Sequence, residues 1–187
     1  MTRAELLKIL VAGAATSAGV MAGAPAGASP ARRPSSLEAR LDVLESREQI
    51  HDLMLAYGRT LDNRDFQGFA DLWAADAEYV QGSARPAKGP AAIRALMEGA
   101  FSRNSAGVRE PNFHVFFNQA IGPIEGDRAT AFSRSAFVAP GADGKLDVVI
   151  AAHYTDAFIR QAGRWKFLRR VIAADAAAPL GKSAPGA

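Results

Sequence analysis

The chain has 187 residues, which is the length of one compact domain, and it contains 49% hydrophobic and 22% charged residues. Its net charge of +3 is spread among acidic residues without a basic stripe carrying spaced aromatics, which excludes a typical nucleic-acid-binding surface. The basic pairs Arg32-Arg33 and Arg169-Arg170 are therefore interpreted as solvated surface. Since there is no cysteine, disulfides, thiolate nucleophiles and cysteine metal sites are excluded as well.

The first residues have the pattern of an export signal. Arg3 and Lys8 precede an apolar, small-residue stretch at residues 9–22, and Ala26-Gly27-Ala28 offers a small-x-small cleavage site. The stretch is shorter and less apolar than a spanning helix, so we expect no stable membrane insertion. The pattern predicts a signal peptide at residues 1–28 and an exported protein, periplasmic or secreted. A short amphipathic or disordered leader on a cytoplasmic protein is the alternative.

The remaining chain divides into a linker at residues 29–34, a folded domain at residues 35–178 and a disordered Gly/Pro/Ala-rich tail at residues 179–187. Three helices are expected first. Two capping-box patterns, at residues 35–38 and 46–49, precede an apolar stripe that runs to Leu61. Asp65 is expected to cap a second helix that carries Phe66, Phe69, Leu72 and Trp73. The third begins at Gly89-Pro90, because proline suits a first helical turn.

After Pro111 the sequence changes to strands. Four are expected, at residues 112–121, 128–138, 146–160 and 164–173, and close-set turn residues between them predict consecutive antiparallel hairpins. Helices followed by a meander indicate an α+β fold, with helices packed on one face of a curved sheet that can enclose a pocket.

Several segments occur together in one order along the chain: Leu44 to Ile50, Leu61-Asp62, Leu72-Trp73, Lys88-Gly89-Pro90, Asn112-Phe113-His114, Tyr154-Thr155-Asp156 and Gly163 to Phe167. Through these segments the chain resembles the SnoaL-like and scytalone dehydratase-like proteins of the nuclear transport factor 2-like superfamily over residues 37–173. The resemblance implies a cone-shaped, cystatin-like fold in which three helices cover a strongly bent antiparallel sheet around a pocket. It also implies a homodimer or a homotrimer.

The enzymatic members of that family keep an Asp at the position of Asp62 and a His at that of His114, and the dehydratases use tyrosines near Tyr57 or Tyr79. The resemblance therefore implies His114 as a base, Asp62 as the group that orients it, and the two tyrosines as hydrogen-bond donors. Imidazole titrates near neutrality, and a carboxylate on its other nitrogen stabilises the imidazolium, so the residue types suit this role. The structural alternatives are a core histidine, a helix-capping Asp62, a core Tyr57 and an ordinary strand residue at Tyr79.

Aromatic strand residues favour a small, cyclic, apolar substrate, and the expected substrate-binding residues are Phe116, Phe132, Phe137, Trp73 and Arg160. Arg160 is included by its position relative to the family's dehydrochlorinase. Trp73 and Trp165 can alternatively be core or hairpin anchors. The family's dehydratases carry further polar residues where this chain has Ala139, Ala152 and the segment Ser135-Ala136-Phe137, which argues against their substrates.

The other two histidines are expected outside the site: His153 at a surface or an interface, and His51 in solvent. The three histidines have no metal-ligand spacing, so we expect neither a metal nor another cofactor. The resulting hypothesis is a cofactor-independent lyase, a dehydratase or related eliminating enzyme with an Asp-His dyad. A ketosteroid-isomerase-like proton shuttle and a non-catalytic exported binder of an apolar ligand are the alternatives.

Overall fold

The computed structural model describes residues 36–104 and 108–177. The predicted signal peptide, linker and tail lie outside the described residues and stay predictions. None of the described helices is both long and apolar enough to cross a membrane.

A single helix of 26 residues, α2 (Leu37–Asp62), follows Ser36 at the start of the described chain. Ser36 caps it, because its hydroxyl accepts the backbone N–H of Ala39. The prediction of a second helix start at residues 46–49 is wrong. Ser46 is buried inside the helix and accepts a hydrogen bond from the Arg160 guanidinium, so its side chain serves a long-range contact rather than a cap.

The second helix, α3 (Phe66–Asp71), starts at the expected cap, since the Asp65 carboxylate accepts the N–H of Gly68. It is shorter than expected. Trp73 is not helical but begins strand β1 (Trp73–Gln81), which is followed by the short strand β2 (Ala87–Lys88). Trp73 pairs with Phe167 far along the chain, and this distant strand overrides the weak local preference of an alanine-rich segment.

The third helix, α4 (Gly89–Arg103), begins at Gly89-Pro90 as predicted. Four long strands then follow: β3 (Phe113–Glu125), β4 (Arg128–Pro140), β5 (Leu146–Gln161) and β6 (Arg164–Ala177). The sheet has the order β2-β1-β6-β5-β4-β3. It is mixed rather than wholly antiparallel, because β1 runs parallel to β6. The predicted meander is confirmed for β3 to β6.

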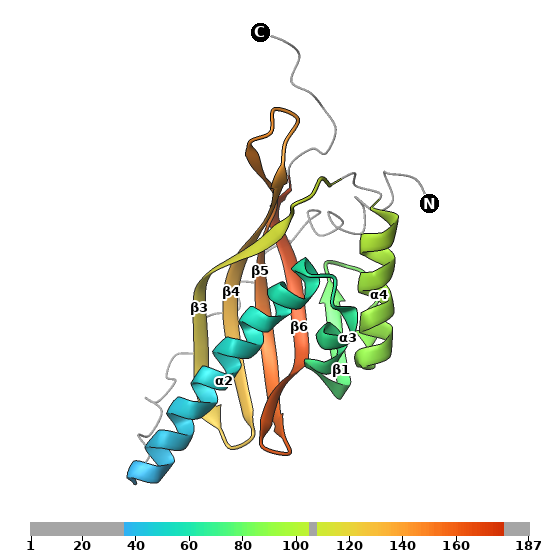
Figure 1. Cartoon of the computed structure of the whole chain (residues 1–187). Helices are drawn as coiled ribbons and strands as arrows, with labels where there is room; N and C mark the ends of the chain where they lie inside the picture. The colour runs from blue at the N-terminus through green and yellow to red at the C-terminus, as the bar shows by residue number, and fades with distance from the viewer. Residues whose placement is uncertain (1–35, 105–107, 178–187) are drawn as a thin grey trace, which may run out of the picture.

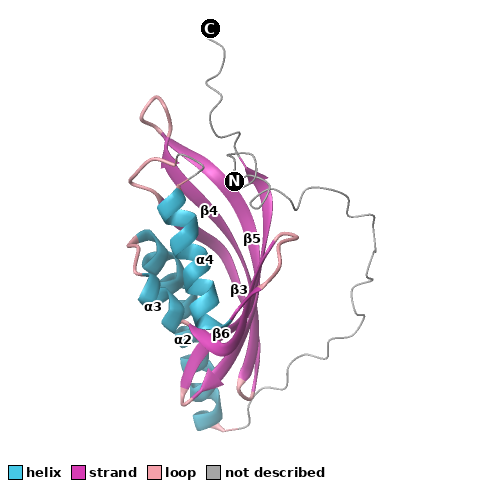
Figure 2. Cartoon of the chain, turned by 90° about the vertical axis from the view of Figure 1, so that its right-hand side faces the viewer, coloured by secondary structure: helices cyan, strands magenta, loops and turns pink. Residues whose placement is uncertain are grey.

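The described helices all lie on one face of the sheet, and none of them covers the opposite face (Figures 1 and 2). The sheet bends strongly around them, and α2 crosses its concave face diagonally (Figures 1 and 2). The core between the two layers is rich in aromatic side chains, among them Tyr57, Phe69, Trp73, Phe158 and Phe167. The α+β, cone-like fold predicted from the sequence is therefore confirmed.

Candidate active site

A cavity of about 250 Å³ lies between the helical layer and the concave face of the sheet. Apolar side chains make up most of its wall: Leu61, Leu96, Met97, Phe101, Val108, Phe137, Val149, Ile150 and Ile172. A smaller polar set contributes Tyr57, Arg64, Tyr79, Gln81, Asn112, His114, Ser135 and Tyr154. Pockets of this kind, apolar with a few convergent polar groups, are typical of small-molecule sites.

Asp62 and His114 meet where α2 ends and β3 begins. The His114 Nδ1 atom lies 2.6 Å from Asp62 Oδ1, and the His114 backbone N–H donates to Asp62 Oδ2 at 3.0 Å. One carboxylate thus holds both the ring and the backbone of the histidine. The side chains of Asp62 and His114 keep 20% and 11% of their surface exposed, so this pair is shielded but not sealed.

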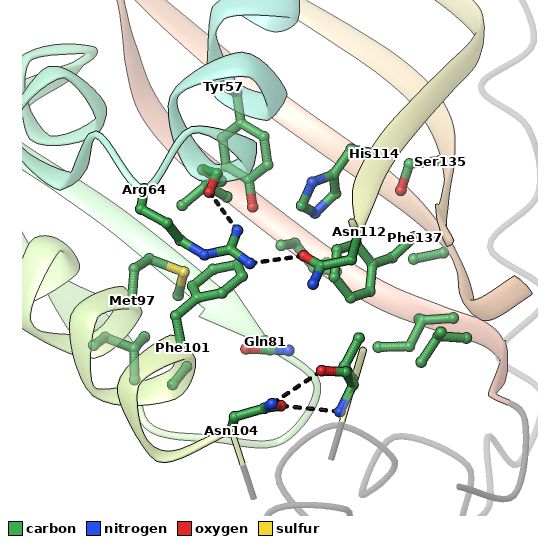
Figure 3. A pocket seen from close by; sticks show the side chains of 18 of the residues that line it. Tyr57, Arg64, Gln81, Met97, Phe101, Asn104, Asn112, His114, Ser135 and Phe137 are labelled. Carbon is green, nitrogen blue, oxygen red and sulfur yellow. Dashed lines mark hydrogen bonds between the residues drawn. The ribbon is translucent and has the colours of Figure 1, made fainter. Parts of the chain in front are cut away.

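His114 borders two hollows, whereas Asp62 borders one. The histidine lines the cavity and also an outer groove between α2 and β3, and Asp62 lines the groove alone. Because Nδ1 is engaged by Asp62, Nε2 is the nitrogen available to a molecule in the cavity, and within the described chain it has no hydrogen-bond partner. Figure 3 shows the ring on the cavity wall between Tyr57 and Ser135. The arrangement fits a base with an orienting carboxylate.

Three tyrosines supply hydroxyl groups to the same cavity. The Tyr57 and Tyr79 oxygens are 3.3 Å apart, and Tyr154 packs edge-on against Tyr57 with ring centroids 5.9 Å apart. Burial raises the pKa of each of these three phenols above its ordinary value. They stay protonated at neutral pH and can donate hydrogen bonds to an oxygen or another electronegative group.

Behind the tyrosines lies an ion pair with no exposed side-chain surface. Arg170 donates from Nε and Nη2 to the two oxygens of Asp156, both at 2.7 Å. The guanidinium carbon also lies 4.1 Å from the ring centroid of Tyr57 and 4.5 Å from that of Tyr154. Burial is the largest single influence on the Arg170 guanidinium and lowers its pKa. The charge and the hydrogen bonds of Asp156, together with smaller contributions from the tyrosines, raise the pKa above its ordinary value. Arg170 therefore places a permanent positive charge beneath the tyrosines.

The interpretation of Arg170 as solvated surface is wrong, and the reason is a β-bulge. On β6, Trp165 and Phe167 face the core, and strict alternation from them puts Arg169 inside and Arg170 outside. The pairing between β5 and β6 shifts register between Ala157 and Phe158, which inverts the alternation and buries Arg170. Asp156 was the available signal, since it shares the inward alternation of Tyr154 and Phe158.

Of the five residues expected to bind substrate, Phe137 lines the cavity. Phe116 does not. It lines the outer groove and its ring stacks beside that of His114, with centroids 6.1 Å apart. Phe116 thus contacts the candidate base rather than the cavity.

The remaining three expected substrate contacts lie away from the cavity, and their assignments need correction. Phe132 is 38% exposed and stacks on His153 on the open face of the sheet. Trp73 is a core residue at the start of β1. Arg160 forms ion pairs with Asp42 and Asp127, which tie α2 to the hairpin ends. Strand patterning cannot separate these roles, because it gives the face of a side chain and not the outline of the hollow.

Sequence reasoning also missed the polar end of the cavity. Arg64 adopts a left-handed backbone conformation with φ of 59°, and its guanidinium donates to the side chains of Asn112 and Glu110. It also lies 4.2 Å over the ring of Phe101, which belongs to α4. These contacts join the end of α2 to α4 and to the segment before β3 (Figure 3). A positive φ at a non-glycine residue next to Asp62 has no signal in the sequence.

The two other histidines lie outside the cavity. His153 bonds through Nδ1 to Asp175 at 2.7 Å on the open face of the sheet, in agreement with a surface position. His51 lies with Glu48 and Asp52, and their potential ligand atoms are within 4.8 Å of one another. This grouping follows from helical spacing of three and four residues, and none of its members lines the cavity.

Comparisons with known proteins agree with the fold. The chain is 28% identical to a gamma-hexachlorocyclohexane dehydrochlorinase of Sphingobium indicum over 144 residues, which cover 75% of this chain and 87% of that protein. The crystal structure of LinA superposes with a TM-score of 0.64 at 26% identity, and the match covers 78% of this chain and 98% of LinA.

A third comparison is with an ntf2-like protein of cystatin-like fold from Novosphingobium aromaticivorans. It superposes with a TM-score of 0.67 at 32% identity, over 77% of this chain and 92% of that chain. The SnoaL-like domain model matches residues 42–171, a range that includes both members of the Asp62–His114 pair. With the fold, the cavity and these matches in agreement, the chain belongs to the SnoaL-like domain family.

Proposed function

We propose that this protein is a cofactor-independent lyase that removes a proton and a leaving group from a small cyclic apolar substrate. The observation that carries the proposal is the Asp62–His114 contact of 2.6 Å at the wall of an apolar cavity. The relative from Sphingobium indicum, whose name states a dehydrochlorination, supports the same class of reaction.

In the proposed reaction, His114 Nε2 takes a proton from a substrate carbon. The electron pair of that C–H bond forms a double bond to the neighbouring carbon, and the leaving group departs with the electrons of its own bond. Asp62 stabilises the resulting imidazolium and keeps the ring in one orientation. A halide leaves as an anion, and the imidazolium then releases its proton to solvent. A hydroxyl leaves as water by taking up the proton that the imidazolium carries, which returns His114 to its neutral form.

The buried tyrosines assist the departure. Neutral phenols at Tyr57 and Tyr79 line a largely apolar cavity, where a hydrogen bond to developing negative charge is stronger than in water. The positive charge of Arg170, in contact with the Tyr57 ring, adds to that stabilisation. The set supplies a base and several donors from the chain's own side chains.

The test uses gamma-hexachlorocyclohexane and a panel of cyclic hydroxyketones as probes, with chloride release and loss of water followed by mass spectrometry. We expect turnover of at least one probe, and a loss of about 100-fold or more in His114→Gln and Asp62→Asn, the usual size of general-base catalysis. The matched control is His153→Gln, because His153 and Asp175 form a pair of similar geometry on the open face of the sheet.

Three results would overturn the proposal. One is turnover that survives in both His114→Gln and Asp62→Asn. Another is a product that has lost no group and differs in mass from the probe only by deuterium taken from solvent, which identifies the isomerase alternative. The third is binding of every probe with no turnover of any, which favours the non-catalytic binder.

A further inference from the structure

Gly58 lies in the interior of α2, where glycine is unfavourable. It is buried, and it occupies the fifth position from the end of a 26-residue helix. Glycine in a helix interior costs about 1 kcal/mol relative to alanine. Its backbone is helical rather than left-handed, so conformation does not require glycine here. The reason must be space.

The space beside Gly58 is filled from β3. A Cβ atom on residue 58 would lie 2.6 Å from Cε2 of Phe116 and 3.4 Å from Cβ of His114. The first distance is far inside van der Waals contact. The ring of Phe116 therefore occupies the space that a side chain at position 58 would need, whereas the distance to His114 is an ordinary van der Waals contact.

The residues of this contact also build the candidate dyad. Gly58 and Asp62 are four residues apart and so share one face of the helix, and His114 and Phe116 are two residues apart and share one face of the strand. The same carboxylate of Asp62 meets both the backbone N–H and the ring of His114. That double contact fixes the separation of α2 and β3 one helical turn from Gly58.

Three aromatic rings restrict the Phe116 ring on the side away from the outer groove. This ring lies edge-on to Tyr57 at 6.3 Å and to Tyr154 at 5.9 Å, and nearly parallel to the ring of His114 at 6.1 Å. A side chain at position 58 would push this ring toward the tyrosines or move β3 outward. Either displacement is transmitted to His114, which is two residues away and in ring contact.

We propose that Gly58 is a positioning residue for His114: the missing side chain leaves room for the Phe116 ring, so that β3 lies where one carboxylate holds both the backbone and the ring of the histidine. Phe116 is its counterpart on the strand. The functional part of this inference rests on the proposed role of His114 as a base, whereas the steric part does not.

The test compares Gly58→Ala, Phe116→Leu and the double variant Gly58→Ala/Phe116→Leu in the full chain. Nitrogen-15 NMR of the His114 ring reports the proton between Nδ1 and Asp62 without any substrate. In Gly58→Ala we expect this signal to shift or disappear and turnover of the identified probe to fall about 10- to 100-fold, since displacements of about 1 Å have effects of that size. Phe116→Leu should keep the signal.

The double variant gives the sharper readout. Leucine lacks the ring edge that the new methyl group meets, so we expect the Nδ1 signal to return and turnover to recover to within a few-fold of wild type. If Gly58→Ala does not fold, recovery of a folded protein with the signal in the double variant supports the same inference. Gly99→Ala is the control, because its Cβ would meet only the flexible guanidinium of Arg103 in α4.

The inference would be overturned if Gly58→Ala kept a normal Nδ1 signal and an unchanged dependence of turnover on pH. A double variant without the signal would overturn it as well. Failure of the proposed function gives a different pattern. If Gly58→Ala alters the Nδ1 signal while His114→Gln leaves turnover unchanged, the positioning role stands and the lyase proposal falls.

Discussion

Two pairs of a carboxylate and a basic side chain lie on the concave side of this protein and differ mainly in their access to solvent. Asp156 and Arg170 have no exposed side-chain surface and two hydrogen bonds of 2.7 Å between them. Asp62 and His114 have one side-chain contact of 2.6 Å, keep some exposed surface and border open space. The first pair carries a fixed charge, and the second contains a group that can gain and lose a proton. Complete burial therefore suits Asp156–Arg170 to a structural role, whereas partial exposure leaves the Asp62–His114 pair accessible to a substrate.

The largest expected effect comes from removing one charge of the buried Asp156–Arg170 ion pair. Asp156→Asn leaves the guanidinium of Arg170 buried without a charged partner, which typically costs about 3–5 kcal/mol of unfolding free energy. Urea denaturation followed by circular dichroism measures it. The double variant Asp156→Asn/Arg170→Met removes both charges and should lose clearly less. An equal loss in the single and double variants would show that packing, not charge, holds this region.

Substitution in the Asp62–His114 pair should lower turnover much more than stability. Asp62→Asn keeps an oxygen that can accept the N–H of His114 but removes the charge that stabilises an imidazolium. We expect turnover to fall about 100-fold, or about 2.7 kcal/mol in activation free energy, while the unfolding free energy changes by less than about 1 kcal/mol. Parallel kinetics and denaturation check this. A stability loss as large as that of Asp156→Asn would erase the contrast between the pairs.

Alkaline pH should lower the stability of the folded protein through the buried tyrosines near Arg170. Burial raises the pKa of Tyr57, Tyr79 and Tyr154, so the folded protein holds these protons where the unfolded chain has released them. Stability is therefore fully present below the ordinary tyrosine pKa of about 10 and falls as the pH rises above it. Denaturation midpoints from pH 8 to pH 11 measure the decline. Tyr79→Phe should make it shallower, and an unchanged slope would contradict this cause.

The smallest effect is expected at the exposed ion pairs of Arg160. Its guanidinium contacts Asp42 on α2 and Asp127 between β3 and β4. Exposed pairs contribute about 0.2–1 kcal/mol, so Asp42→Ala should lower the unfolding free energy by less than about 1 kcal/mol and leave turnover unchanged. High salt should reduce the difference from wild type. A marked loss of turnover in Asp42→Ala would indicate that Arg160 contributes to substrate binding after all.

Local sequence signals were enough to predict the three helices, the four long strands after them and the α+β class, and the resemblance to a family pattern pointed to Asp62 and His114 as partners. Caps, proline at a first helical turn and strand alternation are local signals, so Asp65, Pro90 and the hairpins of β3 to β6 were predictable. The identity of the proton-handling candidates needed no geometry beyond that pattern.

Which side chains reach the cavity depends on tertiary contacts and could not be fully predicted from the sequence. The β-bulge that buries Arg170, the long-range pairing that turns Trp73 into a strand residue, and the close approach at Gly58 all depend on segments far apart in the chain. Such contacts arise when two layers pack, and the local sequence records the face of a residue but not the neighbour it meets. For that reason Phe132 and Arg160 were assigned to the wrong place, while the fold was assigned to the right one.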